Sequence, residues 1–150
     1  MANNPFISSL CDEKSFFNIF LKDLRYAKTE VIIESPFITT TRMNTLAPAL
    51  QKLVNKGIKV YVITRDPKEH QLPYREQSEL EIRHFEQIGI QVLICKGNHH
   101  RKLAIIDREI LWEGSLNILS QSRSKEIVRR IEGRQHAMEM LNYLKLGRFL

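Results

Sequence analysis

The last third of this 150-residue chain gathers side chains that could together transfer a phosphoryl group. His100 and Lys102 are separated by one residue, and Asp107 follows after four apolar or small residues. A Gly-Ser-x-Asn segment containing Ser115 and Asn117 comes shortly afterwards. A neutral imidazole can attack phosphorus and divide one difficult displacement into two, while an ammonium and an amide neutralise and orient the non-bridging oxygens. The pattern therefore predicts covalent phosphoryl chemistry at His100, which requires no metal ion.

These side chains must be positioned by a strand and the turn that ends it. The apolar run 103–106 has β-type composition, and alternation along a strand would send His100 and Lys102 to the same face. Asp107 stands where this strand reaches a turn before a second short run, 110–112, with which it should pair. Asp107 is a candidate site residue whose position also fits a mainly structural role.

The constellation HxKx4Dx6GSxN resembles the catalytic motif of the phospholipase D superfamily, because five positions match at fixed spacing. The resemblance implies that His100 is the nucleophile and that Lys102 and Asn117 bind phosphate. Ser115 would be a nearby hydroxyl donor. The resemblance also implies a glutamate on the following strand that orients the nucleophilic imidazole and stabilises its protonated form, and Glu126 matches that position.

The number of motif copies bears on the oligomeric state. Members of the superfamily use two such motifs around one active site, where one histidine attacks and the other protonates the leaving oxygen. This chain carries a single copy. The resemblance therefore implies a homodimer in which the two His100 side chains converge across a two-fold axis.

The other histidines lack neighbours that suggest chemistry. We expect surface or structural roles for His70, His84, His99 and His136. Cys95 and His99 do not indicate a zinc site, since the chain has two cysteines and no second Cys-x-x-Cys or His-x-x-x-His pair. We therefore predict neither a metal nor a cofactor.

Composition places the chain among globular proteins of one domain, spanning residues 1–150. It is 43% hydrophobic and 27% charged, and 23 basic against 17 acidic residues give a net charge of +6. That surplus suits a polyanion, either nucleic acid or an anionic membrane face. No apolar run approaches the roughly 20 residues that span a bilayer, and the N-terminus lacks the pattern of a secretory signal. We expect a cytoplasmic protein without a membrane span.

Hydrophobic periodicity predicts an α/β fold. We expect helices over residues 12–27, 43–55 and 78–88 and after Gly133, and strands over 31–33, 58–64, 90–94, 103–106, 110–112 and 126–131. The alternation of strands and helices implies right-handed parallel crossovers. Together with the resemblance, it predicts a single phospholipase D-like domain with a mixed, mostly parallel sheet flanked by helices on both faces.

Several local details follow from the same reading. Strand 90–94 is expected to be buried and to form a hairpin with the motif strand, and 38–42 is expected to be a loop. Pro48 would sit in the first turn of its helix or shift the helix start. Residues 116–120 would begin a short helix whose amides face the phosphate pocket.

Two loops could add contacts to the site. The hydroxyls of Ser35 and residues 39–41 follow the first core strand, where α/β folds bind ligands, and they fit ordinary loop residues equally well. Segment 65–76 contains two prolines and reads as a long loop. Its cations and Tyr74 could contact phosphates or stack on a base, or could simply be solvated.

The sequence therefore predicts a metal-independent phosphodiesterase similar to the short bacterial nucleases of the superfamily. It would cut nucleic acid, DNA in preference to RNA, through a phosphohistidine at His100, with the second His100 acting as general acid. Two alternatives stay open: a catalytically inactive nucleic-acid-binding or protein-interaction module of the same fold, and a phosphodiesterase that acts on phospholipids. The resemblance also implies that a helicase or another defence or repair protein could be a partner.

Overall fold

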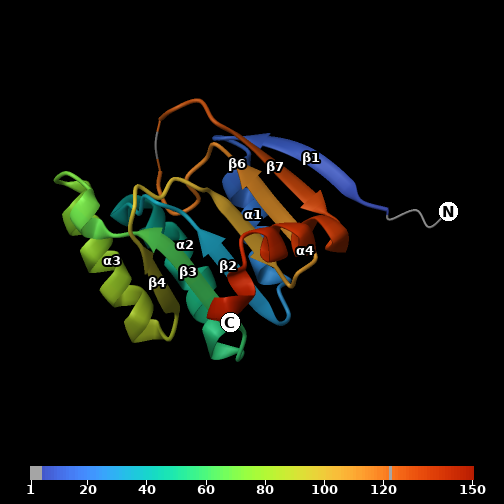
Figure 1. The fold of residues 1–150 in the computed structure, drawn as a ribbon, viewed down its shortest axis with the longest axis horizontal. Coiled ribbons are helices and arrows are strands. Elements are labelled where there is room, and N and C mark those ends of the chain that lie inside the picture. The colour runs from blue at the N-terminus through green and yellow to red at the C-terminus, as the bar shows by residue number, and fades with distance from the viewer. Residues whose placement is uncertain (1–4, 122) are drawn as a thin grey trace.

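The computed structural model describes residues 5–121 and 123–150, which fold around one seven-stranded sheet of order β1-β7-β6-β5-β2-β3-β4 (Figure 1). The strands are β1 (Ile7–Asp12), β2 (Glu30–Glu34), β3 (Lys59–Arg65), β4 (Gln91–Cys95), β5 (Leu103–Ile106), β6 (Ile110–Gly114) and β7 (Ile127–Glu132). The helices are α1 (Phe16–Arg25), α2 (Thr40–Asn55), α3 (Tyr74–Ile88) and α4 (Arg134–Tyr143), with 3-10 turns η1 (Pro67–Glu69) and η2 (Leu146–Phe149).

The sheet is mixed, as predicted, but it is not mostly parallel. Only β2–β3 and β3–β4 pair in parallel, while the four pairings β1–β7, β7–β6, β6–β5 and β5–β2 are antiparallel. The expectation of a mostly parallel sheet is wrong because the motif strand β5 enters antiparallel to β2. The meander from β5 to β7 then extends the antiparallel half.

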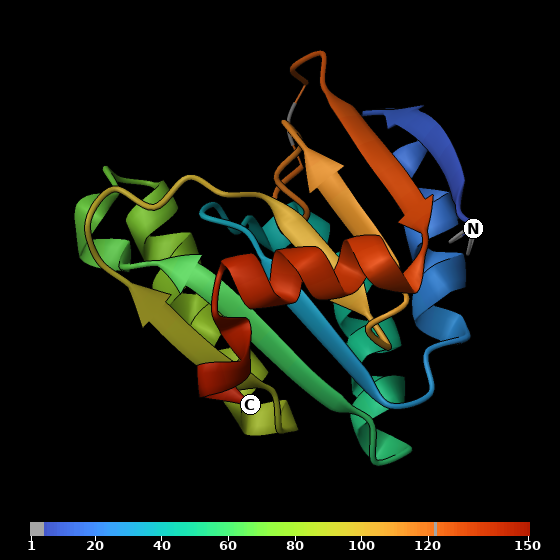
Figure 2. The same ribbon diagram turned by 45° about the vertical axis from the view of Figure 1, so that its right-hand side comes forward.

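The motif strand also has a different partner from the expected one. β4 does not form a hairpin with β5, because β4 lies at the sheet edge beside β3 and β5 lies between β2 and β6. Residues 96–102, which we call the motif loop, connect Cys95 to Leu103 and pass across the ends of β3 and β2 (Figure 2). This crossing carries His100 to the edge where the two parallel strands end, which is where α/β folds commonly bind ligands.

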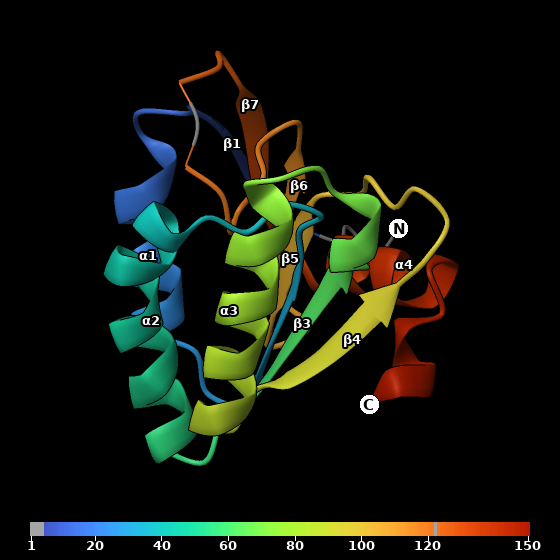
Figure 3. The ribbon, with the colours of Figure 1, turned by 90° about the vertical axis from the view of Figure 1, so that its left-hand side faces the viewer.

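Helices cover both faces of the sheet, which confirms that part of the prediction. α1, α2 and α3 pack on one face and α4 on the other (Figure 3). Trp112 is fully buried beneath α1, edge-on to Phe16 and Phe20. Its indole donates to Asp23 Oδ2 at 2.8 Å, and the Arg130 guanidinium binds both carboxylate oxygens of Asp23. β6 and β7 are thereby fixed to α1.

Several predicted element boundaries need correction. α2 begins at Thr40, not Met43, because the Thr39 hydroxyl caps it by accepting from the Arg42 amide. Pro48 therefore lies inside the helix. The carbonyl left without a partner there belongs to Asn44, which is exposed like Pro48, so water can satisfy it.

Other corrections concern short or exposed segments. Residues 116–120 form a single turn closed by the Ser120 amide on the Asn117 carbonyl, and not the expected helix. β4 is an edge strand whose Ile94 is 51% exposed, and not a buried strand. Segment 65–76 is partly ordered into η1 and the start of α3. None of the helices within the described residues is long and apolar enough to cross a bilayer.

Candidate active site

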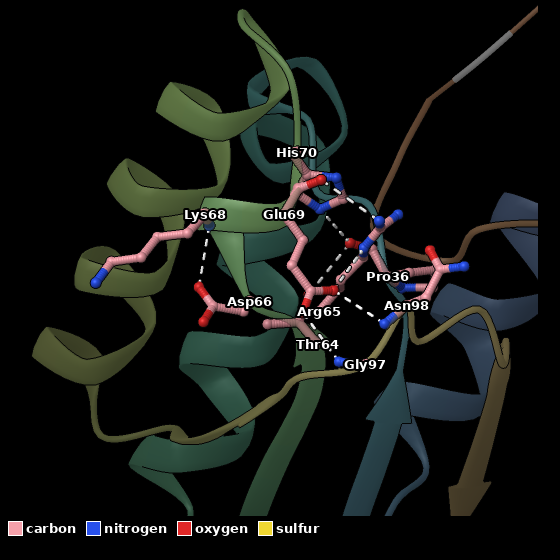
Figure 4. Close-up of polar contacts among 9 residues, drawn as sticks. All are labelled: Pro36, Thr64, Arg65, Asp66, Lys68, Glu69, His70, Gly97 and Asn98. Atoms are coloured by element: carbon pink, nitrogen blue, oxygen red, sulfur yellow. Dashed lines mark hydrogen bonds and ion pairs between the residues drawn. The ribbon is translucent and has the colours of Figure 1, made fainter.

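The first half of the motif loop is held by the Glu69 carboxylate of η1 (Figure 4). Glu69 Oε2 accepts from the Gly97 amide at 2.9 Å and Oε1 from the Asn98 amide at 3.0 Å, while Arg65 Nε donates to Oε1. Both loop residues have positive φ, 95° and 64°, which glycine and asparagine tolerate better than most. The hydrogen bonds from the two amides lower the pKa of Glu69 below its usual value. A charged, ion-paired anchor thus precedes His100.

The second half of the loop is held by Glu34, the last residue of β2. Glu34 is fully buried, and its Oε1 lies 2.5 Å from His99 Nε2, in ion-pair contact without hydrogen-bond geometry. The same oxygen accepts from Arg101 Nε at 3.1 Å. One carboxylate therefore holds the residues on both sides of His100. The sequence predicts a surface or structural role for His99 and does not single out Glu34 or Arg101.

His100 itself is exposed on this anchored loop. Lys102 Nζ donates to the His100 backbone carbonyl at 2.6 Å, so the ammonium folds back over the loop. Both residues precede β5, which starts at Leu103, and strand alternation therefore does not fix their directions. Within residues 5–121 and 123–150, no hydrogen bond or ion pair joins the side chains of His100 and Glu126.

Asn117 and Glu126 meet in a pocket of about 300 Å³ that Arg42 and Glu13 also line, which we call the Asn117 pocket. Asn117 Oδ1 is buried and accepts no hydrogen bond from the described residues. The Glu126 amide donates to Glu13 Oε1 at 2.8 Å, which fixes the backbone where Glu126 enters β7. The structure therefore places one predicted phosphate ligand and the predicted orienting carboxylate in one cavity.

Two hydroxyl groups in the chain after β2 hold the loop that follows Asn117. Ser35 Oγ accepts from the Leu119 amide and Thr39 Oγ1 accepts from the Gln121 amide, at 3.2 and 3.0 Å. Both hydroxyl residues are buried. Ser35 and Thr39, which we considered as ligand contacts, instead tie the loop after Asn117 to the start of α2.

Ser115 has a similar tie to β7. Its hydroxyl bonds both the carbonyl and the amide of Ile127, at 3.3 and 3.1 Å. Gly114 precedes it where the strands approach closely, since a Cβ there would lie 2.3 Å from the Ile127 carbonyl oxygen. Ser115 and Lys102 line a second, wider cleft of about 860 Å³ on the α4 side of the sheet, the Ser115 cleft.

Asp107 lies at the other end of β5, about 17 Å from the end of the motif loop at the usual rise per residue. Its carboxylate accepts from the backbone amides of Lys28, Thr29 and Glu30, at 2.8–3.1 Å, and from the Thr29 hydroxyl. Burial raises the pKa of Asp107, but the hydrogen bonds together lower it below its usual value. The structure separates Asp107 from the other candidates and gives it a role in joining β5 to β2.

The remaining histidines lie away from the motif loop or serve structural contacts. His70 is buried, and its Nε2 bonds the Pro36 carbonyl at 2.9 Å (Figure 4). Burial lowers the pKa of His70, which favours the neutral ring that can donate there. His84 Nδ1 contacts Glu81, and the His136 ring contacts Phe6.

The long segment after β3 is mostly engaged within the protein. Arg65 pairs with Glu69, Arg75 lies 3.7 Å from Glu79, and the Tyr74 ring packs edge-on against Phe37. These contacts favour the structural reading of segment 65–76 over the substrate-binding one.

A His-x-Lys motif on the loop that leads into β5, a close Gly-Ser turn and this order of strands together are typical of the phospholipase D-like class. Residues 20–145 match the family model described as "Cardiolipin synthase, PLD-like domain". The chain therefore belongs to the phospholipase D superfamily, as its motif predicted, and is at this level a phosphodiester hydrolase.

Solved structures share this fold over nearly the whole chain. A phospholipase D family member, Nuc from Salmonella typhimurium, is 18% identical with a TM-score of 0.75, covering 94% of this chain and 93% of that one. NucT from Helicobacter pylori is 19% identical with a TM-score of 0.69, covering 94% of each chain. Phosphatidylserine synthase from Haemophilus influenzae is 15% identical with a TM-score of 0.70, covering 98% of this chain but 39% of its own. No curated protein sequence matches the chain.

Proposed function

We propose that the chain is a metal-independent endonuclease that works through a phosphohistidine at His100. The observation that carries this proposal is the motif loop, which presents His100 to solvent between two carboxylate anchors, Glu34 and Glu69. A nucleophile needs such a fixed backbone, because in-line attack depends on the position of the attacking atom.

The proposed reaction has two balanced steps. In the first, His100 attacks the phosphorus of a phosphodiester, and the partner's His100 gives a proton to the leaving oxygen. In the second, the partner's His100 takes a proton from water, which attacks the phosphohistidine and releases His100. Asn117 and Lys102 would neutralise the non-bridging oxygens, for which Lys102 must leave the His100 carbonyl.

Charge around the Ser115 cleft supports a nucleic-acid substrate. Four cations line it with a single carboxylate, Glu113, among the described residues: Arg101, Lys102, Lys125 and Arg129. Tyr143 at its rim is 83% exposed and could stack on a base. The net charge of +6 supports the same substrate class.

The homodimer is part of the proposal because one chain carries one motif. The mechanism needs two motif histidines, and this chain supplies one, His100. A two-fold interface would bring in the partner's His100. DNA in preference to RNA and a helicase or repair partner remain predictions from the resemblance, and a cytoplasmic location remains a prediction from the sequence.

The deciding experiment is cleavage of labelled single- and double-stranded DNA and RNA in excess EDTA. Wild type should cut and His100→Ala should not, while His84→Ala, which removes an exposed histidine on α3, should cut normally. Adding excess His100→Ala protein to wild type should reduce activity more than dilution does, because mixed dimers lack one histidine. A folded, dimeric wild type that cuts no nucleic acid would refute the endonuclease.

One observation favours a second candidate, a phospholipid phosphodiesterase. The Ser115 cleft also has an apolar lining, including Leu10, Ile127, Met140 and Leu144, and the first two are 59% and 61% exposed. Release of a headgroup from anionic vesicles by wild type, without cleavage of any nucleic acid, would favour this candidate over the endonuclease.

A further inference from the structure

Arg42 is a buried cation without an acidic partner. Its residue is 7% exposed at the start of α2, and its backbone is fixed by the Thr39 hydroxyl, which accepts from its amide, and by the Thr45 hydroxyl, which donates to its carbonyl. Its Nε has no hydrogen-bond partner among the described residues. The guanidinium lies over the Phe17 ring, whose centroid is 4.5 Å from Cζ.

Two acidic residues lie near Arg42, but neither forms an ion pair with it in the part of the chain that the structure describes. Glu13 and Glu126 line the same pocket, yet neither comes within 4.0 Å of an Arg42 nitrogen in the described structure. Glu13 instead accepts from the Glu126 amide. Burial lowers the pKa of Arg42, which reflects the cost of keeping this charge out of water. A guanidinium nonetheless stays protonated at neutral pH, so the pocket contains a permanent, poorly compensated charge.

The neighbours of Arg42 are suited to an anion that bridges them to it. The Asn117 amide, the Ser120 hydroxyl and Gln121 line the pocket with it, and Asn117 Oδ1 is also buried without a partner. The space is about 300 Å³, several times the roughly 30 Å³ that a water molecule occupies in the liquid. Its lining residues come from the region where α1 and α2 begin and from the segment that joins β6 to β7.

We propose that Arg42 binds a phosphate group of the substrate in the Asn117 pocket, with its planar fork on two phosphate oxygens. This deepens the proposed function and rests on it for the identity of the substrate. A guanidinium matches phosphate geometry with two parallel hydrogen bonds, and these bonds are strongest where water is excluded. Among the described lining residues Arg42 is the single cation, beside two carboxylates, so it is the one charged lining group that can pair with phosphate.

The first test uses inorganic phosphate and thermal unfolding, and needs no catalysis. Phosphate should raise the Tm of wild type by several degrees over its Tm in a non-coordinating buffer, and should leave the Tm of Arg42→Met unchanged. Without phosphate, Arg42→Met should melt no lower than wild type, because the substitution removes a buried, unpaired charge and keeps the volume. Arg83→Met, which removes an exposed arginine of α3, should respond to phosphate as wild type does.

The second test measures nucleic-acid binding in the His100→Ala background, where cleavage cannot interfere. Adding Arg42→Met should raise Kd about tenfold or more and reduce the salt dependence of binding by about one phosphate contact. Arg42→Lys keeps the charge but loses the planar, two-pronged guanidinium. Its Kd should therefore lie between the Kd of the His100→Ala protein with Arg42 and the Kd of that protein with Arg42→Met. If Arg42→Met does not fold, Arg42→Lys takes its place in every measurement.

Two outcomes separate this proposal from the endonuclease. If wild type and the Arg42 variants respond equally to phosphate and bind nucleic acid equally, Arg42 is a structural residue and the proposal is overturned. If phosphate stabilises wild type through Arg42 while no nucleic acid is bound or cut, the phosphate site stands and the endonuclease falls.

Discussion

Asp107 is the member of the motif whose substitution should cost stability and leave chemistry intact. The perturbation is Asp107→Asn, which keeps the side-chain shape and suits the turn, since Asp107 has φ of 56° and asparagine tolerates that region. The asparagine carbonyl can replace Oδ1. Its amide group would face the Lys28 amide, which now donates to Oδ2 at 2.9 Å, so one donor would meet another.

The magnitude follows from the four donors on the carboxylate. A hydrogen bond to a charged acceptor is worth about 1 kcal/mol more than one to a neutral acceptor, which suggests a loss of roughly 4 kcal/mol. Lys28 and Thr29 are exposed, so water can replace part of the lost hydrogen bonding, and we expect the free energy of unfolding to fall by about 2 kcal/mol. For a chain of this length the Tm should fall by roughly 4–8 °C.

The assay is urea unfolding followed by the fluorescence of Trp112, the single tryptophan. The folded-state pKa of Asp107 is lowered, so its charge stabilises the fold above the unfolded-state pKa and ceases to do so as pH falls through the folded-state pKa. The gap between wild type and Asp107→Asn should thus be full at pH 7 and shrink below about pH 4. Asp66→Asn, which weakens one bond to the Lys68 amide, is the matched control and should change little.

Activity per folded molecule completes the test. Because Asp107 lies at the far end of β5 from the motif loop, Asp107→Asn should cut its substrate within about twofold of wild type. Unchanged stability together with a loss of about a hundredfold or more in cleavage would refute the structural assignment and place Asp107 in the chemistry.

Three further substitutions follow from the same contacts. Gly114→Ala should cost about 2 kcal/mol or more in urea unfolding, because its Cβ would strike the Ile127 carbonyl and a backbone cannot yield as a side chain does; a neutral result would contradict the close approach. Glu69→Gln should speed amide hydrogen exchange in the motif loop and lower kcat about tenfold with substrate Kd unchanged, and unaltered exchange would show that Glu69 is no anchor. Asp23→Ala should cost about 3 kcal/mol, since it leaves the Trp112 indole without its acceptor and the partly buried Arg130 without its main partner; a loss under about 1 kcal/mol would contradict this.

Elements with a buried, periodic face could be predicted from the sequence. β2, β3 and the body of α2 follow from apolar runs that local chemistry alone specifies. β1 escaped prediction because five of its six residues are exposed and its pattern carries no burial signal. The predicted pairing of β5 with β4 was wrong because a hairpin prediction considers only segments that are neighbours along the chain. β5 instead pairs with β2, which is distant in the sequence.

The candidate site, like the fold, could be predicted only in part from the sequence. The motif residues could be identified because their spacing is fixed along the chain. Glu34 and Arg42 could not, because each is an ordinary charged residue until the fold removes it from water. A weak signal existed for Glu34, since a carboxylate that ends a continuous apolar strand is carried to the ligand-binding edge.

The pairing of β1 with β7 has a consequence for how the molecule is made and how it opens. Ile7 pairs with Glu132 and Asp12 with Ile127, so β1 cannot take its place in the sheet until β7, the last strand of this sheet in chain order, has been synthesised. Pairing β1 with β7 closes a long loop of chain, yet β1 buries little besides Cys11, so the pairing adds little stability. We therefore expect the backbone amides of β1 to exchange through local opening. Leu10 of this strand forms one wall of the Ser115 cleft. The cleft beside the motif is therefore lined in part by an edge strand that buries little surface, and we expect its width to change when β1 opens locally.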